Sequence, residues 1–131
     1  MRVLLFRICR DFKRLPGGFE VTGEITGTSI TQLPAVLHDN VFAGIALGRE
    51  QQDDEAQSIE LNITDKRRRK IFEYEWRWKF ETNGEAEFRS PLGGVNFTEF
   101  GTYDINLISC NRGFQRVCIA SVQFIVSKPA A

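Results

Sequence analysis

The sequence predicts an all-β protein built as a single antiparallel β-sandwich of about seven to nine strands. Short stretches alternate apolar and polar residues, as at Ile59, Leu61 and Ile63, and this is the period of a half-buried strand. Turn signals made of glycine, proline and asparagine recur between these stretches. No stretch shows the spacing of an amphipathic helix, so the alternation favours sheets throughout.

Composition is consistent with one domain spanning residues 1–131. The chain has 131 residues, of which 42% are hydrophobic, and this is enough for one core. Lys plus Arg and Asp plus Glu number 17 each, so the formal net charge is zero. Proteins that wrap nucleic acid along their whole surface are usually basic, so an anionic partner would have to bind a local patch.

The N-terminal half is expected to contain four strands, at residues 2–9, 19–27, 40–48 and 58–65. Pro16, Gly17 and Gly18 form a turn signal after the first strand. Residues 31–40 are expected to be an irregular connection, because Pro34 has no N–H group to donate to a central ladder. Residues 49–57 are polar and predict a second connection, with room for one helical turn.

The C-terminal half continues the strand pattern. The predicted strands are residues 71–80, 101–110 and 117–127, with short extended pieces in residues 86–101. Asn83 and Gly84 mark a tight turn before those pieces, and residues 91–94 mark another. Residues 111–116 contain a glycine and predict the loop of a hairpin between the last two strands.

Tyr103 is placed as in one particular kind of sandwich. It opens a strand and follows Gly101 by two residues, which is typical of a tyrosine corner, where the Tyr hydroxyl bonds to nearby backbone in immunoglobulin-like domains. Antibody-type domains have a Cys two residues after this Tyr, where the chain has Ile105. The sequence therefore predicts an immunoglobulin-like sandwich without the antibody-type disulfide.

Several of these stretches resemble a family of small bacterial proteins of unknown function, of roughly this length and predicted to be all-β sandwiches. The matching stretches are residues 3–8, 19–27, 33–47, 59–65, 71–80, 97–108 and 120–127. They cover nearly the whole chain and consist of turn and core positions. The resemblance implies the fold and a bacterial or phage context. It implies no activity, because the family has no assigned catalytic residues.

Residues that commonly carry catalysis are few and scattered. The single histidine, His38, neighbours Asp39 in a connection, but the partners of a catalytic triad meet through space rather than along the chain. Cys9, Cys110 and Cys118 lie in strand patterns and are expected to be reduced, unactivated thiols. We therefore expect a protein that is not an enzyme.

Metal and cofactor motifs are also lacking in the sequence. Asp53, Asp54 and Glu55 form an acidic group without the alternation and the glycine of a calcium loop. Residues 92–94 are too short for a phosphate cradle and lack its lysine. The sequence accordingly predicts no metal site and no cofactor.

A basic run precedes the predicted strand at residues 71–80. It consists of Lys66, Arg67, Arg68, Arg69 and Lys70. It lies between two strands that can pair, so it predicts a solvated and mobile hairpin tip with Asp65 at the start of the turn. Two interpretations are open: a solubilising turn that discourages edge aggregation, or a contact with an acidic protein surface or a phosphate backbone.

The strand after this run divides into two faces. Phe72, Tyr74, Trp76, Trp78 and Phe80 share one side, and charged residues of both signs share the other. A nucleic-acid platform would place aromatic and basic side chains on the same face. The five aromatic side chains are instead expected to fill the core between two sheets, which leaves no cavity for a small ligand. Replacing Trp76 by Ala is accordingly expected to collapse the fold.

These observations favour a non-enzymatic protein-interaction or assembly module, such as an accessory subunit of a bacterial or phage system. A partner protein or a second copy can pair with an open sheet edge. The alternative is a nucleic-acid-binding accessory protein that uses the basic hairpin loop. No apolar run approaches the roughly 18 residues of a membrane span, and the N-terminal run is too short for a secretory signal. We therefore expect a cytoplasmic location.

Overall fold

The computed structural model describes residues 1–54, 56–110 and 116–130, and these residues form twelve β-strands and no helix. One sheet contains β1 (Arg2–Cys9), β6 (Phe42–Gly48) and β9 (Glu85–Pro91), in the order β1-β6-β9. A wider sheet contains β4 (Gly27–Ser29), β12 (Val117–Ser127), β11 (Gly101–Ser109), β7 (Ala56–Thr64) and β8 (Lys70–Lys79), in the order β4-β12-β11-β7-β8. The all-β prediction is confirmed. The hairpin loop predicted between β11 and β12 lies largely outside the described residues, as does Glu55 of the acidic group.

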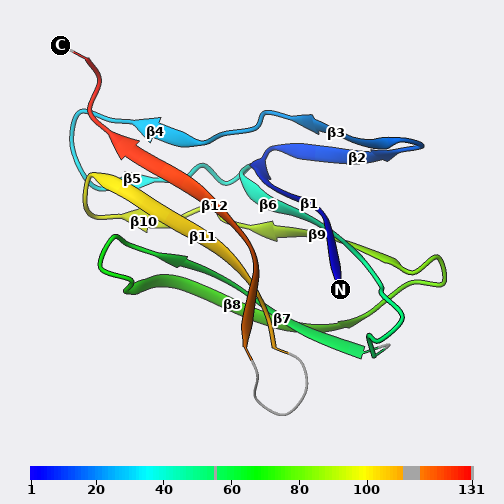
Figure 1. Ribbon diagram of the computed structural model, residues 1–131. Helices are drawn as coiled ribbons and strands as arrows, with labels where there is room; N and C mark the ends of the chain where they lie inside the picture. Colours follow the sequence, from blue (N-terminus) through cyan, green and yellow to red (C-terminus); the bar gives the residue numbers. More distant parts are fainter. Residues whose placement is uncertain (55, 111–115, 131) are drawn as a thin grey trace.

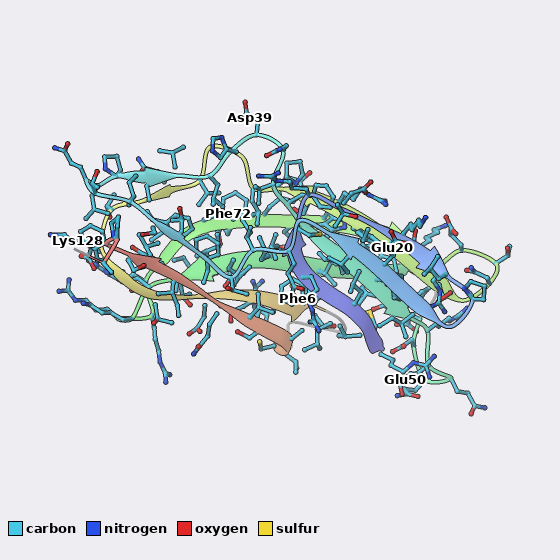
Figure 2. All side chains as sticks on the ribbon, turned by 90° about the horizontal axis from the view of Figure 1, so that it is seen from above. Phe6, Glu20, Asp39, Glu50, Phe72 and Lys128 are labelled. Carbon is cyan, nitrogen blue, oxygen red and sulfur yellow. The ribbon has the colours of Figure 1, made fainter. Side chains whose placement is uncertain are left out.

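Two small sheets complete the fold (Figure 1). β2 (Asp11–Leu15) and β3 (Gly18–Thr22) form a hairpin around the predicted Pro16–Gly17 turn, and β5 (Ala35–Val36) pairs with β10 (Asn96–Phe97). The prediction of about seven to nine strands was too low, because β2 and the two- or three-residue strands β4, β5 and β10 are too short to show a clear alternation. Lys128 and Glu20 lie towards opposite ends of the elongated molecule in Figure 2.

The wide sheet is mixed, which differs from the predicted purely antiparallel arrangement. β4 runs parallel to β12, with Gly27 opposite Ile125, whereas the other strand pairs of the wide sheet are antiparallel. A Cβ atom at Gly27 would lie 2.3 Å from the carbonyl oxygen of Ile125, so only glycine allows this approach. In the sequence, Gly27 ends the strand predicted at residues 19–27. Nothing in that local pattern predicts its contact with the distant strand β12.

The main core lies between the two large sheets. The alternation in β7 and β11 turns Ile59, Leu61, Ile63, Ile105 and Leu107 inward, where all five are fully buried. The rings of Phe97 and Phe124 stack at 5.2 Å between their centroids. A smaller cluster of buried Leu5, Cys9, Phe12 and Ala46 forms where the β2–β3 hairpin packs on the outside of β1 and β6. The hairpin thereby covers part of the outer face of the narrow sheet.

The predicted tyrosine corner is present. The Tyr103 side chain is buried, and its hydroxyl donates to the carbonyl oxygen of Glu99 at 2.8 Å and accepts from the backbone N–H of Glu99 at 3.2 Å. Burial raises the pKa of Tyr103, and the nearby Glu99 carboxylate adds to this. The phenol therefore stays neutral and keeps both bonds, which fix the chain as it enters β11.

The two large sheets meet differently at their two borders. At one border β1 lies beside β12, and a cavity of about 290 Å³ is lined by residues of both strands. At the other border β8 and β9 are the last strands of their sheets, and the described strands add no further partner to either. The second border is where the candidate site lies.

Replacing Tyr103 by Phe removes the hydroxyl and keeps the ring in the core. Because the backbone groups of Glu99 lose their partner, we expect the free energy of unfolding to fall by about 1–3 kcal/mol. Tyr74→Phe is the matched control, since Tyr74 is 55% exposed. Urea denaturation followed by circular dichroism measures both variants. Equal midpoints for the two would contradict a stabilising role for the corner.

Candidate functional site

The basic run forms the tip of a hairpin, as the sequence predicted. β7 and β8 pair antiparallel on either side of it. One carboxylate oxygen of Asp65 accepts from the backbone N–H groups of Arg67 and Arg69 at 2.9 Å, and the other accepts from Arg69 Nε at 2.8 Å. Hydrogen bonding from Arg69 is the main reason why the pKa of Asp65 lies below its usual value. Arg68 adopts the left-handed conformation, with φ of 62°. Asp65 thus organises the turn.

All five cations of this tip are exposed, as expected of a solvated turn, but three of them are paired with carboxylates. Arg69 also lies 3.5 Å from Glu99, and Arg67 lies 3.8 Å from the same carboxylate. Lys70 contacts Glu60 at 3.3 Å and Glu73 at 3.1 Å. Within the described ranges, only Lys66 and Arg68 of the five cations form no ion pair. The tip therefore presents much less net positive charge than its sequence indicates.

A second group of cations lies near β2. It consists of Arg7, Arg10, Lys13 and Arg14. The β2–β3 hairpin and the β7–β8 tip extend towards opposite ends of the molecule in Figure 1. Arg7, Lys13 and Arg14 each pair with a glutamate, at 3.2, 3.5 and 3.0 Å. The two basic groups therefore do not join into one anion-binding surface.

Glu60 is a buried carboxylate on the outer face of β7, and no pattern in the sequence marks it. It accepts from Asn62 at 2.6 Å and pairs with Lys70 and Arg116. Burial alone would raise the pKa of Glu60, but the hydrogen bonds from Asn62, Arg116 and Lys70 outweigh burial and hold this pKa below its usual value. In the sequence, Glu60 is an ordinary outward residue of an alternating strand. The side chains that pair with it, Lys70 and Arg116, come from other parts of the chain.

Glu60 makes the stability of the fold depend on pH. Because its pKa is lower in the folded chain than the usual 4.5, its stabilising effect is complete above that pH and is lost as the pH falls through the folded-state pKa. We expect Glu60→Gln to show a smaller loss of unfolding free energy between neutral and acidic pH than the parent chain. Urea titrations across this pH range measure the difference. Glu87→Gln is the control and should keep the parental pH dependence, because it removes a carboxylate at an exposed position of β9 and leaves the ion pairs of Glu60 in place.

The aromatic side of β8 is not the filled core that the sequence predicted. Only Phe80 is buried; Phe72, Trp76 and Trp78 are half-buried, and Tyr74 is 55% exposed. The alternation correctly predicts that these side chains share one face. The prediction that another sheet fully covers this face is wrong, because β8 is the last strand of its sheet and the facing sheet ends at β9.

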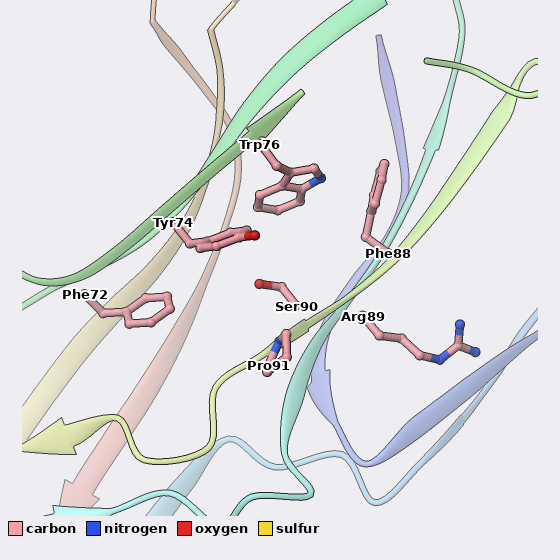
Figure 3. Close-up of a pocket in the computed structure, with 7 residues that line it drawn as sticks. All are labelled: Phe72, Tyr74, Trp76, Phe88, Arg89, Ser90 and Pro91. Carbon is pink, nitrogen blue, oxygen red and sulfur yellow. The ribbon is translucent and has the colours of Figure 1, made fainter. Parts of the chain in front are cut away.

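An open aromatic groove of about 450 Å³ results between β8 and β9. Its lining residues are Phe72, Tyr74, Trp76, Phe88, Arg89, Ser90 and Pro91. Figure 3 shows Phe72, Tyr74 and Trp76 in a row pointing from β8 towards β9, with Phe88 and the Ser90 hydroxyl pointing back towards β8. Ring centroids are 5.5 Å apart for Tyr74 and Trp76 and also for Trp76 and Phe88. The expectation that aromatic side chains leave no space is therefore wrong at this border.

Polar groups at the groove are sparse. The Arg89 side chain turns away from the groove in Figure 3, and its guanidinium lies 4.2 Å from the centre of the Phe12 ring and donates to the Phe12 carbonyl. Trp78 packs at 5.0 Å from Phe88, and its Nε1 is buried without a hydrogen-bond partner among the described residues. The surface is thus mainly aromatic, with the Tyr74 and Ser90 hydroxyls as its polar features.

The residues weighed for catalysis do not come together. His38 is exposed and shares a shallow cavity with Arg10, Asp39 and Asn40. All three cysteines are free thiols, and burial raises the pKa of Cys9 and Cys110, so these two are not activated as nucleophiles. In the described part of the chain, no group of three His, Cys, Asp or Glu side chains is arranged to hold a metal ion. The same part contains no helix long and apolar enough to cross a membrane.

No family model, curated protein or solved structure matches this chain. The resemblance to small bacterial proteins of unknown function therefore stays a prediction. The candidate site is defined by its geometry alone: a half-buried row of aromatic side chains beside two sheet edges.

Because the groove leaves the Trp76 ring partly exposed, we expect Trp76→Ala to destabilise the fold less than the sequence predicted. Trp76→Ala should keep the fold and lower the free energy of unfolding by about 1–2 kcal/mol, because the ring is only partly removed from water. Phe97→Ala, at a fully buried ring, is the comparison and should cost about 3–5 kcal/mol. Urea denaturation in dilute solution measures both. A larger loss for Trp76→Ala than for Phe97→Ala would place Trp76 in the core after all.

Proposed function

We propose that this protein is a non-enzymatic interaction or assembly module that binds a protein partner along β8 and the adjoining aromatic groove. The observation that carries this proposal is the exposure of aromatic side chains beside an open strand edge. Tyr74 and Trp76 offer large apolar surfaces, and aromatic residues are enriched in the buried centres of protein interfaces.

The open edges supply the second part of such an interface. An edge strand presents unpaired backbone N–H and C=O groups, to which another strand can add. β8 and β9 are both edge strands and flank the groove. A partner strand beside β8 would satisfy backbone groups and cover aromatic rings in the same step. The sparse polar lining favours a protein surface over a charged small molecule.

The wider assignments belong to the same proposal. We place the fold with immunoglobulin-like sandwiches because of its two facing sheets and its tyrosine corner, with β4 as a parallel addition. A cytoplasmic accessory subunit of a bacterial or phage system accords with the three free thiols and with the family resemblance.

The alternative function, nucleic-acid binding at the basic tip, is supported by Lys66 and Arg68. Both side chains are exposed, and neither forms an ion pair within the described residues. The carboxylates around Arg67, Arg69 and Lys70 weaken this support, because they cancel most of the local charge.

Affinity capture from cells of the native host tests the two functions against each other. The full chain is compared with a groove variant, Tyr74→Ser/Trp76→Ser, and a tip variant, Lys66→Ser/Arg68→Ser. We expect specific protein partners to be lost with the groove variant and kept with the tip variant, as measured by quantitative mass spectrometry. Proteins retained equally by both variants would contradict the proposal. Nucleic acid lost with the tip variant, and released by salt, would favour the alternative.

A further inference from the structure

The edge strand β8 carries a charge pattern that is complementary to itself. The face opposite its aromatic row presents Glu73, Glu75, Arg77 and Lys79, two acids followed by two bases, with Trp76 at the centre of the series. Turning the strand end to end converts this order into two bases followed by two acids. Building on the proposed function, we propose that the partner of β8 is β8 of a second copy, paired antiparallel with Trp76 opposite Trp76.

Pairing in this register matches all four charges from Glu73 to Lys79 on the outward face of β8. Glu73 faces Lys79 of the second copy, Glu75 faces Arg77 of the second copy, and two-fold symmetry repeats both contacts. Residues directly opposite in an antiparallel pair lie on the same face with Cβ atoms about 4.5–5.5 Å apart, which is within reach of an ion pair. The two five-stranded sheets would join into one continuous sheet.

Other registers also keep the aromatic faces of both copies on the same side of the joined sheet. The two nearest of these place like charges opposite each other. A pair centred on Glu75 sets this carboxylate against its own copy. A pair centred on Arg77 sets two guanidinium groups against each other and also brings Glu73 opposite Glu81. Like charges directly opposite destabilise a sheet, so the pattern selects the register centred on Trp76.

The charges required for this contact are available in a single copy. In the part of the chain that the structure describes, Arg77 and Lys79 are exposed and form no ion pair. Glu73 lies 3.1 Å from Lys70, and Glu75 lies 3.9 Å from Arg116, with side-chain exposures of 61% and 50%. The acids are thus held at the surface and remain accessible to a partner strand.

The aromatic face gains burial from the same contact. A two-fold axis perpendicular to the joined sheet keeps both aromatic faces on one side, so Tyr74 stands opposite Trp78 of the second copy. The two grooves would then open towards each other and close around the Trp76 pair. The Tyr74 hydroxyl would also lie on the same face as the buried Trp78 Nε1 of the second copy, which has no partner among the described residues of one chain. The groove is therefore half of an interface.

Charge exchange tests the pairing. The two variants are Arg77→Glu/Lys79→Glu, which makes the face wholly acidic, and Glu73→Lys/Glu75→Lys, which makes it wholly basic. Light scattering and sedimentation velocity should show the parent chain as a dimer. Each variant alone should self-associate about a hundredfold more weakly, because every ion pair becomes a like-charge contact. An equal mixture of the two should form a heterodimer, since every contact is again between opposite charges.

Two controls separate this pairing from general effects. Lys66→Glu/Arg68→Glu changes the net charge by the same amount as Arg77→Glu/Lys79→Glu but lies at the hairpin tip, so it should remain dimeric. Circular dichroism checks that each variant is folded, and recovery in the mixture is itself a control, because a misfolded chain would not be rescued.

The outcomes distinguish this inference from the proposed function. A monomeric parent chain, or a dimer that survives both charge variants, would overturn pairing through β8 in this register. If the charge variants stay dimeric but Tyr74→Ser/Trp76→Ser is monomeric, the groove is an interface and only the register is wrong. If all of these variants stay dimeric, self-association occurs elsewhere and the groove loses this support as well.

Discussion

The unequal width of the two facing sheets is the constraint on which the candidate functional surface depends. Five described strands face three, so the narrow sheet covers β7 and β11 fully and β8 only in part, through contacts such as that of Trp76 with Phe88. Residues under the narrow sheet, such as Ile59 and Ile105, are fully buried, whereas Tyr74 on the partly covered strand β8 is 55% exposed. The β2–β3 hairpin packs on the outside of the narrow sheet and so does not extend its width. The groove is thus a direct consequence of strand order.

Local patterns in the sequence predicted the local structure well. The alternation identified the inward residues of β7 and β11, the Pro-Gly-Gly and Asn-Gly signals marked real turns, and Tyr103 formed the expected corner. Each of these depends on residues close together in the chain. The parallel pairing of β4 with β12 depends on a contact between Gly27 and Ile125, almost one hundred positions apart, and no local pattern contains it.

The two errors at the candidate site have the same physical origin. Period-two alternation shows which side chains share a face, but it does not show whether another sheet covers that face, so the row from Phe72 to Phe80 was assigned to the core. Counting cations likewise shows how many charges a loop carries, but not which carboxylates reach it. Glu99 and Glu60 come from other strands or loops and pair with Arg69 and Lys70. In both cases the wrong prediction concerned which other segments lie next to β8 or the hairpin tip. The topology of the whole chain determines those neighbours, and local sequence patterns do not.

The two faces of β8 are best understood together. An aromatic edge strand is an aggregation hazard, and proteins commonly protect such edges with charge. Charges of one sign would repel every copy, whereas two acids followed by two bases are fully matched in the register centred on Trp76 and not in its neighbours. A two-fold pairing also uses up the β8 edge of both copies, so association through β8 closes at the dimer instead of growing into a fibre. The same four side chains can therefore discourage open-ended association and specify a dimer. In the proposed dimer, the order of the charges along β8, rather than their sum, would therefore specify the partner.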